Sequence, residues 1–125
     1  MTWTPQNLVD YAKRQQFKTP VKSGYNQKVV LAFFKEHGIP EPEFEVRFHP
    51  DRMWRSDICW RGRGLMLECD GGIFIAGGHN RGAQMLKTWE KENEACCMGY
   101  RILRCQPKDL CTKDTADLIK RCLGL

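Results

Sequence analysis

Two acidic residues in the middle of the chain have the types and the spacing that a divalent-cation site needs. Asp57 precedes, and Glu68 follows, a short glycine-rich connection from Arg61 to Gly64 that predicts a β-hairpin. If Trp60 faces Leu65 across this turn, counting back along both strands brings Asp57 opposite Glu68. Directly opposed side chains lie about 4.5 to 5.5 Å apart at Cβ, where two carboxylates repel each other unless something positive lies between them.

A bound cation is the simplest source of that positive charge. Mg2+ is commonly held by one or two carboxylates together with waters and substrate phosphate, which matches what this pair offers. The sequence therefore predicts a Mg2+ or Mn2+ site at Asp57 and Glu68. A hairpin shifted in register would instead leave two separate, solvated acids, and the sequence alone leaves this alternative open.

The same register assigns the hairpin residues to two faces. Ile58, Trp60, Leu65, Leu67 and Cys69 point into a core, whereas Arg55, Asp57, Glu68 and Asp70 share the other face.

Other segments supply the elements that must position this hairpin. Phe44, Val46 and Phe48 alternate with polar residues, which predicts a half-buried strand. Hydrophobic periodicity, together with glycine, proline and capping residues, predicts four helices: 5–16, 25–37, 83–98, and one from Thr112 or Asp114 to about Leu123. A last strand is predicted over 100–105. We expect an α/β fold with a mixed sheet of about four strands flanked by helices, the last strand returning parallel to a neighbour through a right-handed crossover.

Composition favours one domain with a polyanionic partner. The 125 residues suit a single domain, and a net charge of +5 suits nucleic acid. Six arginines surround the candidate acids in the sequence: Arg47, Arg52, Arg55, Arg61, Arg63 and Arg81.

The seven cysteines form no secreted framework, and the chain has neither a signal-peptide pattern nor a membrane-spanning run. We therefore expect reduced thiols and a cytoplasmic location. Cys59, Cys69 and Cys105 fall on predicted strands, so a zinc site is one interpretation, but without a C-x-x-C pair buried small hydrophobic residues are the better one.

Several runs in fixed order resemble a known family. The chain is similar over about 43–107 to small PD-(D/E)XK nucleases often encoded in phages and mobile elements, through the stretches 47–60, 65–72, 78–81, 90–93 and 99–104. The resemblance implies a restriction-endonuclease-like core and a Mg2+-dependent DNA endonuclease. Residues 1–24, which contain the first predicted helix, would form a helical extension before that core. The resemblance also implies that Asp57 and Glu68 bind the metal with the backbone carbonyl of Cys69, and it suggests Glu45 as a third acid, although a solvated strand residue is an equal alternative.

The chain departs from that family at two positions. Asp70 occupies the place of the motif lysine, and Thr88 stands where the resemblance leads us to expect an acid. We expect Lys91, in the run Glu90-Lys91-Glu92-Asn93, to replace the missing lysine.

Further residues are candidates for contacts with DNA. His79 and Arg81 lie in a glycine-rich segment after the second hairpin strand. His79 would transfer a proton or bind a phosphate, and Arg81 would contact a phosphate; an ordinary surface loop is the alternative. Arg47, Arg55, Arg61 and Arg63 are the remaining candidates, with a solvated basic turn as the alternative for the last two. Trp54 and Trp60 fit base stacking or, better, a core.

Two functions follow from these features. The first is an endonuclease acting on nicked, branched, single-stranded or duplex DNA, for which cutting both strands would favour a homodimer. The second is a catalytically weakened DNA-binding protein on the same fold, favoured by Asp70 and Thr88.

Overall fold

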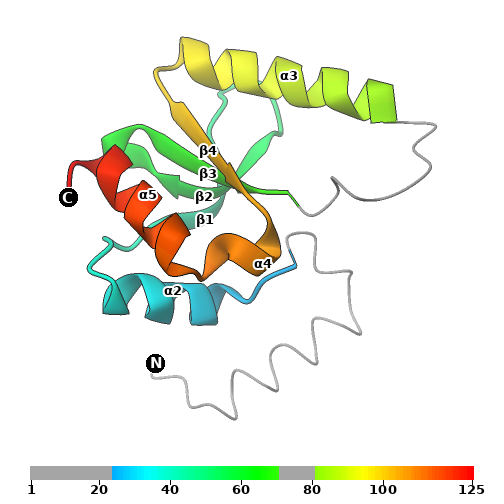
Figure 1. The fold of residues 1–125 in the computed structure, drawn as a ribbon. Coiled ribbons are helices and arrows are strands. Elements are labelled where there is room, and N and C mark those ends of the chain that lie inside the picture. Colours follow the sequence, from blue (N-terminus) through cyan, green and yellow to red (C-terminus); the bar gives the residue numbers. More distant parts are fainter. Residues whose placement is uncertain (1–23, 71–80) are drawn as a thin grey trace.

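A four-stranded mixed sheet with helices on both faces organises the part of the chain that the computed structural model describes, residues 24–70 and 81–125 (Figure 1). The strands are β1 (Glu43–Arg47), β2 (Arg55–Trp60), β3 (Leu65–Cys69) and β4 (Arg101–Cys105), in that spatial order. The β1–β2 and β2–β3 pairs are antiparallel and the β3–β4 pair is parallel. The expectation of a mixed α/β sheet with flanking helices is confirmed.

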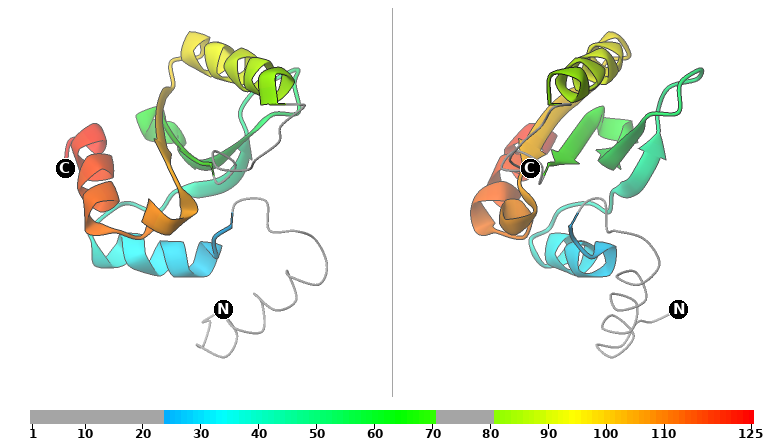
Figure 2. Two further views of the ribbon diagram at one scale, coloured as in Figure 1. Left: turned by 45° about the vertical axis from the view of Figure 1, so that its right-hand side comes forward. Right: turned by 90° about the vertical axis from the view of Figure 1, so that its right-hand side faces the viewer.

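Helices cover the sheet unequally. The helices are α2 (Gln27–Glu36), α3 (Arg81–Cys97), α4 (Pro107–Leu110) and α5 (Lys113–Leu123). In both orientations of Figure 2, α3 lies on one side of the sheet, while α2, α4 and α5 lie on the other. The sequence did not predict α4. The helix expected over 5–16 lies outside the described residues.

The ends of α2 and α5 follow from local chemistry. The Asn26 side chain accepts hydrogen bonds from the Lys28 and Val29 amides at 2.9 and 3.2 Å, so it satisfies two donors at the start of α2. Thr112 does the same for the Thr115 amide at the start of α5. Gly124 follows α5 at φ 75°, a conformation that glycine adopts without a Cβ penalty.

The β2–β3 hairpin has the register that the turn predicted. Residues Arg61–Arg63 form one turn of 3-10 helix, and Gly64 takes φ 59°. Trp60 pairs with Leu65 and Ile58 with Leu67. The same register, continued by one residue, brings Asp57 beside Glu68.

The larger core lies between the sheet and α2 and α5. Every hairpin residue predicted to face the core does so, and the helices contribute Val30, Phe34, Ala116, Ile119 and Leu123. Trp60 is a core residue, 4% exposed, and its Nε1 donates a hydrogen bond to the Pro40 carbonyl at 2.8 Å. This arrangement satisfies the polar atom of a buried aromatic ring.

A smaller core under α3 corrects one prediction for β1. Val46 and Phe48 belong to this core, whereas Phe44 packs against the larger core on the other face. Simple alternation, which would have put all three on one face, is wrong because Glu45 takes φ 51° and interrupts the pleat between Phe44 and Val46.

The connection from β3 to β4 places α3 over the second face. Ala95 of α3 is buried against Cys59 and Met66 of the sheet. The helix ends where Gly99 takes φ 92° and the Tyr100 amide donates to the Ala95 carbonyl at 3.0 Å. A parallel neighbour for the last strand, joined through a helix, is as predicted.

Within 24–70 and 81–125, no helix has the length and apolar character needed to cross a membrane.

Candidate active site

Asp57 reaches from β2 to the backbone of β3. Its Oδ2 accepts a hydrogen bond from the Cys69 amide at 2.9 Å, and its own carbonyl accepts from the Tyr25 hydroxyl at 3.4 Å. The first bond fixes the carboxylate beside Glu68, the residue that precedes Cys69. The second ties the same strand position to the segment that leads into α2. No sequence pattern indicated the contact between Tyr25 and Asp57.

Glu68 lies under α3 and contacts the predicted substitute lysine. Its Oε1 is 3.3 Å from Lys91 Nζ, and the two side chains are only 10% and 22% exposed. Lys91 thus brings a positive charge to the acid pair from a helix rather than from the strand. This placement agrees with the expectation that Lys91 replaces the motif lysine; its catalytic role stays a prediction.

Burial and the neighbouring Asp57 change the proton affinity of Glu68. The pKa of Glu68 is raised from 4.5 to about 7, chiefly by burial; Lys91 opposes this rise and the neighbouring Asp57 adds to it. A hydrogen bond between the Glu68 and Asp57 carboxyls acts in the same direction as burial. Glu68 therefore binds a proton near neutral pH, chiefly because it is buried and secondarily because Asp57 lies beside it.

This donor set fits Mg2+ better than a metal that needs a closed cage. No group of three or more histidine, cysteine, aspartate or glutamate side chains suited to a metal occurs in the described part of the chain. Two carboxylates and one carbonyl are nonetheless what Mg2+ commonly takes from a protein, since waters and phosphate oxygens complete its octahedron. The two carboxylates of Asp57 and Glu68 fit that ion, whereas the Cys69 carbonyl, which the family resemblance implies, stays a prediction.

Glu45, the suggested third acid, belongs to the strand that pairs with β2. It lies in β1, half-buried, at the register position across from Asp57, between the pairs Phe44 with Ile58 and Val46 with Ser56. At Glu45, where φ is 51°, the side chains of β1 change from one face of the sheet to the other. Its suggested role as a metal ligand stays a prediction.

Ion pairs fix α3 over the sheet and so fix Lys91. Arg104, whose Cα is paired with Glu68 across β3 and β4, forms an ion pair with Glu92, the residue after Lys91. Two further pairs join α3 to the β1–β2 connection: Glu90 with Arg52 at 2.8 Å and Glu94 with His49 at 3.4 Å. The acidic residues around Lys91 therefore dock the helix, a role that the sequence analysis missed.

Comparison with protein-family models, curated proteins and solved structures finds no match. The family resemblance rests on the sequence motifs alone, and it stays a prediction.

The two departures from the family have distinct positions. Asp70 is exposed at the end of β3, and its amide donates a hydrogen bond to the Cys105 carbonyl at 2.9 Å. Thr88 lies on α3 one turn before Lys91, and its hydroxyl donates to the Gln84 carbonyl at 3.0 Å. Neither side chain brings a positive charge to Glu68, so Lys91 is the cation that does.

The candidate DNA-binding arginines fall into two groups. At the hairpin turn, Arg61 pairs with Glu43 at 3.0 Å and Arg63 donates to the Leu123 carbonyl at 2.9 Å, so both have structural partners. Arg47 and Arg55 are paired with each other at the other end of β1 and β2, where both are exposed and Arg55 is two residues from Asp57. His79 and the Arg81 side chain lie outside the described residues.

The strand cysteines divide between the two faces of the sheet. Cys59 belongs to the core under α3, whereas Cys69 belongs to the larger core and Cys105 packs against it. Because the sheet separates Cys59 from the other two, the three thiols do not form one zinc site. Cys59 and Cys69 are buried among apolar side chains, in agreement with the alternative interpretation.

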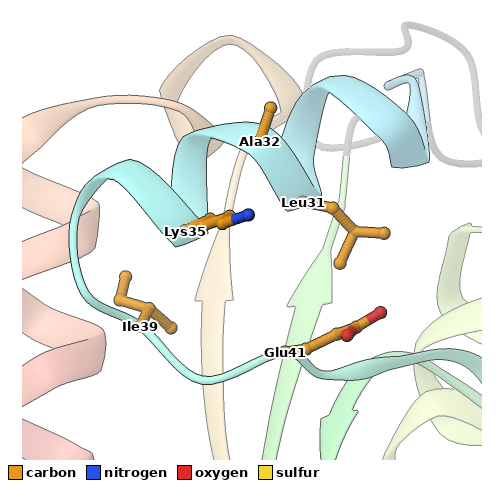
Figure 3. A pocket seen from close by; sticks show the side chains of 5 residues that line it. All are labelled: Leu31, Ala32, Lys35, Ile39 and Glu41. Carbon is orange, nitrogen blue, oxygen red and sulfur yellow. The ribbon is translucent and has the colours of Figure 1, made fainter. Parts of the chain in front are cut away.

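A groove of about 400 Å³ lies away from the acid pair (Figure 3). Its lining comes from α2 and the segment that follows it: Leu31, Ala32, Lys35, Ile39 and Glu41. Since α2 covers the face opposite α3, this groove is separated from Asp57 and Glu68 by the sheet. It contributes nothing to their chemistry.

Proposed function

We propose that this protein is a metal-dependent DNA endonuclease of the PD-(D/E)XK type with a restriction-endonuclease-like core. The observation that carries the proposal is the contact among Asp57, Glu68 and Lys91, which places two carboxylates and one ammonium within a partly buried site. The motifs around these residues support the same conclusion. Two opposed acids would only weaken DNA binding, so a site that keeps them favours chemistry over binding.

Each residue then has a defined task in phosphodiester hydrolysis. Asp57 and Glu68 would hold Mg2+ or Mn2+ together with the Cys69 carbonyl, and the Cys69 amide fixes the orientation of Asp57. When bound, the ion supplies Lewis acidity and lowers the pKa of a coordinated water. Lys91 stabilises negative charge that develops on the phosphate, because its ammonium already lies at the acid pair. His79 is proposed as a supporting proton-transfer group.

The partner is proposed to be DNA, with nicked, branched or single-stranded forms as the candidate substrates. Exposed Arg47 and Arg55 lie near the acid pair, where phosphate contacts would position the strand for cleavage. A homodimer would allow both strands of a duplex to be cut. All seven cysteines are free thiols, which supports the proposed cytoplasmic location.

A weakened DNA-binding protein is the second candidate, and one observation favours it. The ion pair with Glu68 engages Lys91, and the strand position of the usual lysine holds Asp70. If Lys91 serves only to neutralise Glu68, the protein binds DNA without cutting it.

A cleavage assay with matched variants separates the two candidates. Purified protein is incubated with labelled linear, nicked, single-stranded and four-way-junction DNA in Mg2+, Mn2+ or EDTA. We expect cleavage of at least one substrate in Mg2+ or Mn2+ and none in EDTA. Asp57→Asn and Glu68→Gln should abolish it, whereas the exposed Asp51→Asn and Glu36→Gln should not.

Each alternative outcome has a clear meaning. Undiminished cleavage in EDTA would contradict the metal mechanism. Binding of DNA without cleavage of any substrate would support the second candidate.

A further inference from the structure

Cys69 and Cys105 end two neighbouring parallel strands side by side. They are paired at Cα across β3 and β4, and they are the last residues of those strands. Both side chains face the larger core, the face opposite α3. The Cys69 thiol is buried at 5% exposure and the Cys105 thiol is half-buried, so a small oxidant reaches the pair through Cys105.

The spacing suits a covalent bond between the two sulfurs. Neighbouring strands lie about 4.7 to 4.9 Å apart, inside the range of about 4.4 to 6.8 Å that disulfides span between Cα atoms. The proximity of the two thiols raises the pKa of Cys69 and lowers the pKa of Cys105.

We propose that Cys69 and Cys105 form a reversible disulfide on oxidation and that this bond alters the acid pair beside it. The second half of this proposal rests on the proposed function, whereas the first half does not.

Hydrogen peroxide is a sufficient oxidant, and the reaction balances. Cys105 releases its proton and its sulfur attacks one peroxide oxygen; the O–O bond breaks, the departing hydroxide takes the proton and leaves as water, and Cys105 becomes a sulfenic acid. The Cys69 sulfur then attacks the Cys105 sulfur, the S–O bond breaks, and hydroxide leaves with the Cys69 proton as a second water. Two electrons pass from the thiols to the peroxide, and a dithiol reductant reverses the change.

The disulfide acts on the site through the backbone of Cys69. Its amide holds the Asp57 carboxylate at 2.9 Å, its carbonyl is a proposed metal donor, and Glu68 precedes it. A disulfide needs a Cβ–S–S–Cβ torsion near 90° and favours a Cα separation of about 5.5 to 6 Å, which is larger than the spacing of neighbouring strands, so bond formation should displace Cys69 relative to β4. A displacement of Cys69 changes the positions of two metal donors at once, so the oxidised protein should bind Mg2+ more weakly.

Peptide mapping tests the bond without any need for activity. Trypsin should place Cys69 in a peptide over 64–81, Cys105 in 105–108, Cys111 in 109–113 and Cys122 in 122–125, so each possible link has its own mass. The full-length protein is treated with hydrogen peroxide, free thiols are blocked, and the peptides are compared with and without dithiothreitol. We expect a dithiothreitol-sensitive link between the first two peptides, lighter by two hydrogen atoms than their sum.

Two matched variants serve as controls. Cys105→Ser should abolish the link, whereas Cys122→Ser, another half-buried cysteine that packs against the same core, should preserve it. Oxidation of the exposed Cys96 and Cys97 without this link would overturn the proposal, because the oxidant would have acted elsewhere. A link from Cys105 to the exposed Cys111 in its place would overturn it equally.

The effect on the site has its own measurement. The Mg2+-dependent rise in melting temperature should largely disappear on oxidation, return with dithiothreitol and resist peroxide in Cys105→Ser. A link that forms while the Mg2+ response stays unchanged would refute the coupling. A reduced protein that never responds to Mg2+ would refute the proposed metal site and leave the disulfide intact.

Discussion

Replacing Glu68 by glutamine should change how the stability of the metal-free protein depends on pH. Burial and Asp57 raise the pKa of Glu68 from 4.5 to about 7. Because the folded-state pKa exceeds the unfolded value, folding favours the protonated acid. This contribution is fully present below about pH 4.5 and is lost as the pH rises through about 7.

The magnitude follows from the size of that change. Each tenfold change in proton affinity corresponds to about 1.4 kcal/mol, so the parent should lose on the order of 3 kcal/mol across this range, most of it between pH 5 and pH 8. Glutamine carries no proton to release and should not show this loss. The Glu68→Gln protein should therefore gain on the parent as pH rises, although it loses the ion pair with Lys91.

Chemical denaturation in EDTA at several pH values measures the difference. Glu36→Gln, an exposed change of the same kind in α2, provides the matched control and should follow the parent curve. Added Mg2+ should flatten the parent curve, because the cation favours the ionised acid. Parallel curves for parent and Glu68→Gln would refute the claim that burial and Asp57 act on Glu68.

Three other predictions test the site. Lys91→Ala should lower cleavage about 100-fold or more and change DNA affinity little, since it removes charge stabilisation. Lys87→Ala, at an exposed lysine one turn before Lys91 on α3, should leave both unchanged. Equal cleavage rates for the parent and Lys91→Ala would exclude the catalytic role of Lys91. Mg2+ at 100 times its Kd should raise the free energy of unfolding of the parent by about 2.7 kcal/mol, measured by thermal unfolding. Asp57→Asn should lose this stabilisation, and a response equal to that of the parent would contradict the metal assignment. Arg55→Ala should reduce the slope of log DNA affinity against log salt concentration by about 1. Arg61→Ala should change this slope less, because the Arg61 guanidinium already pairs with Glu43. A slope for Arg55→Ala equal to that of the parent would exclude Arg55 from the DNA contacts.

The hairpin was predictable because its register is set locally. A four-residue glycine-containing turn fixes which residues face each other, and alternation then assigns every side chain of β2 and β3 to a face. Gly64 at φ 59° and the pairing of Trp60 with Leu65 are consequences of that turn. The position of the acid pair could therefore be predicted by counting from the turn.

Other features depend on contacts that no local pattern encodes. The parallel alignment of β3 with β4 is set by the packing of α3, not by a turn, so the pairing of Glu68 with Arg104 could not be counted from the sequence. The positive φ of Glu45 breaks the alternation of β1 without a glycine to signal it. Arg63 at the turn binds the end of α5, sixty residues later in the chain, so its charge alone was a poor guide to its role.

The migration of the lysine follows from the way this fold crosses the sheet. A residue two positions after Glu68 would share its face, but Asp70 holds that place and adds negative charge near the acid pair. The connection from β3 to β4 must lay its helix across one face of the sheet, and here that face carries Asp57 and Glu68. An inward residue of α3 can therefore supply the missing charge without any change in the strands. The position of Lys91 then depends on how α3 packs on the sheet. The residues on either side of it, Glu90 and Glu92, form ion pairs with Arg52 and Arg104, and these contacts hold the helix in place.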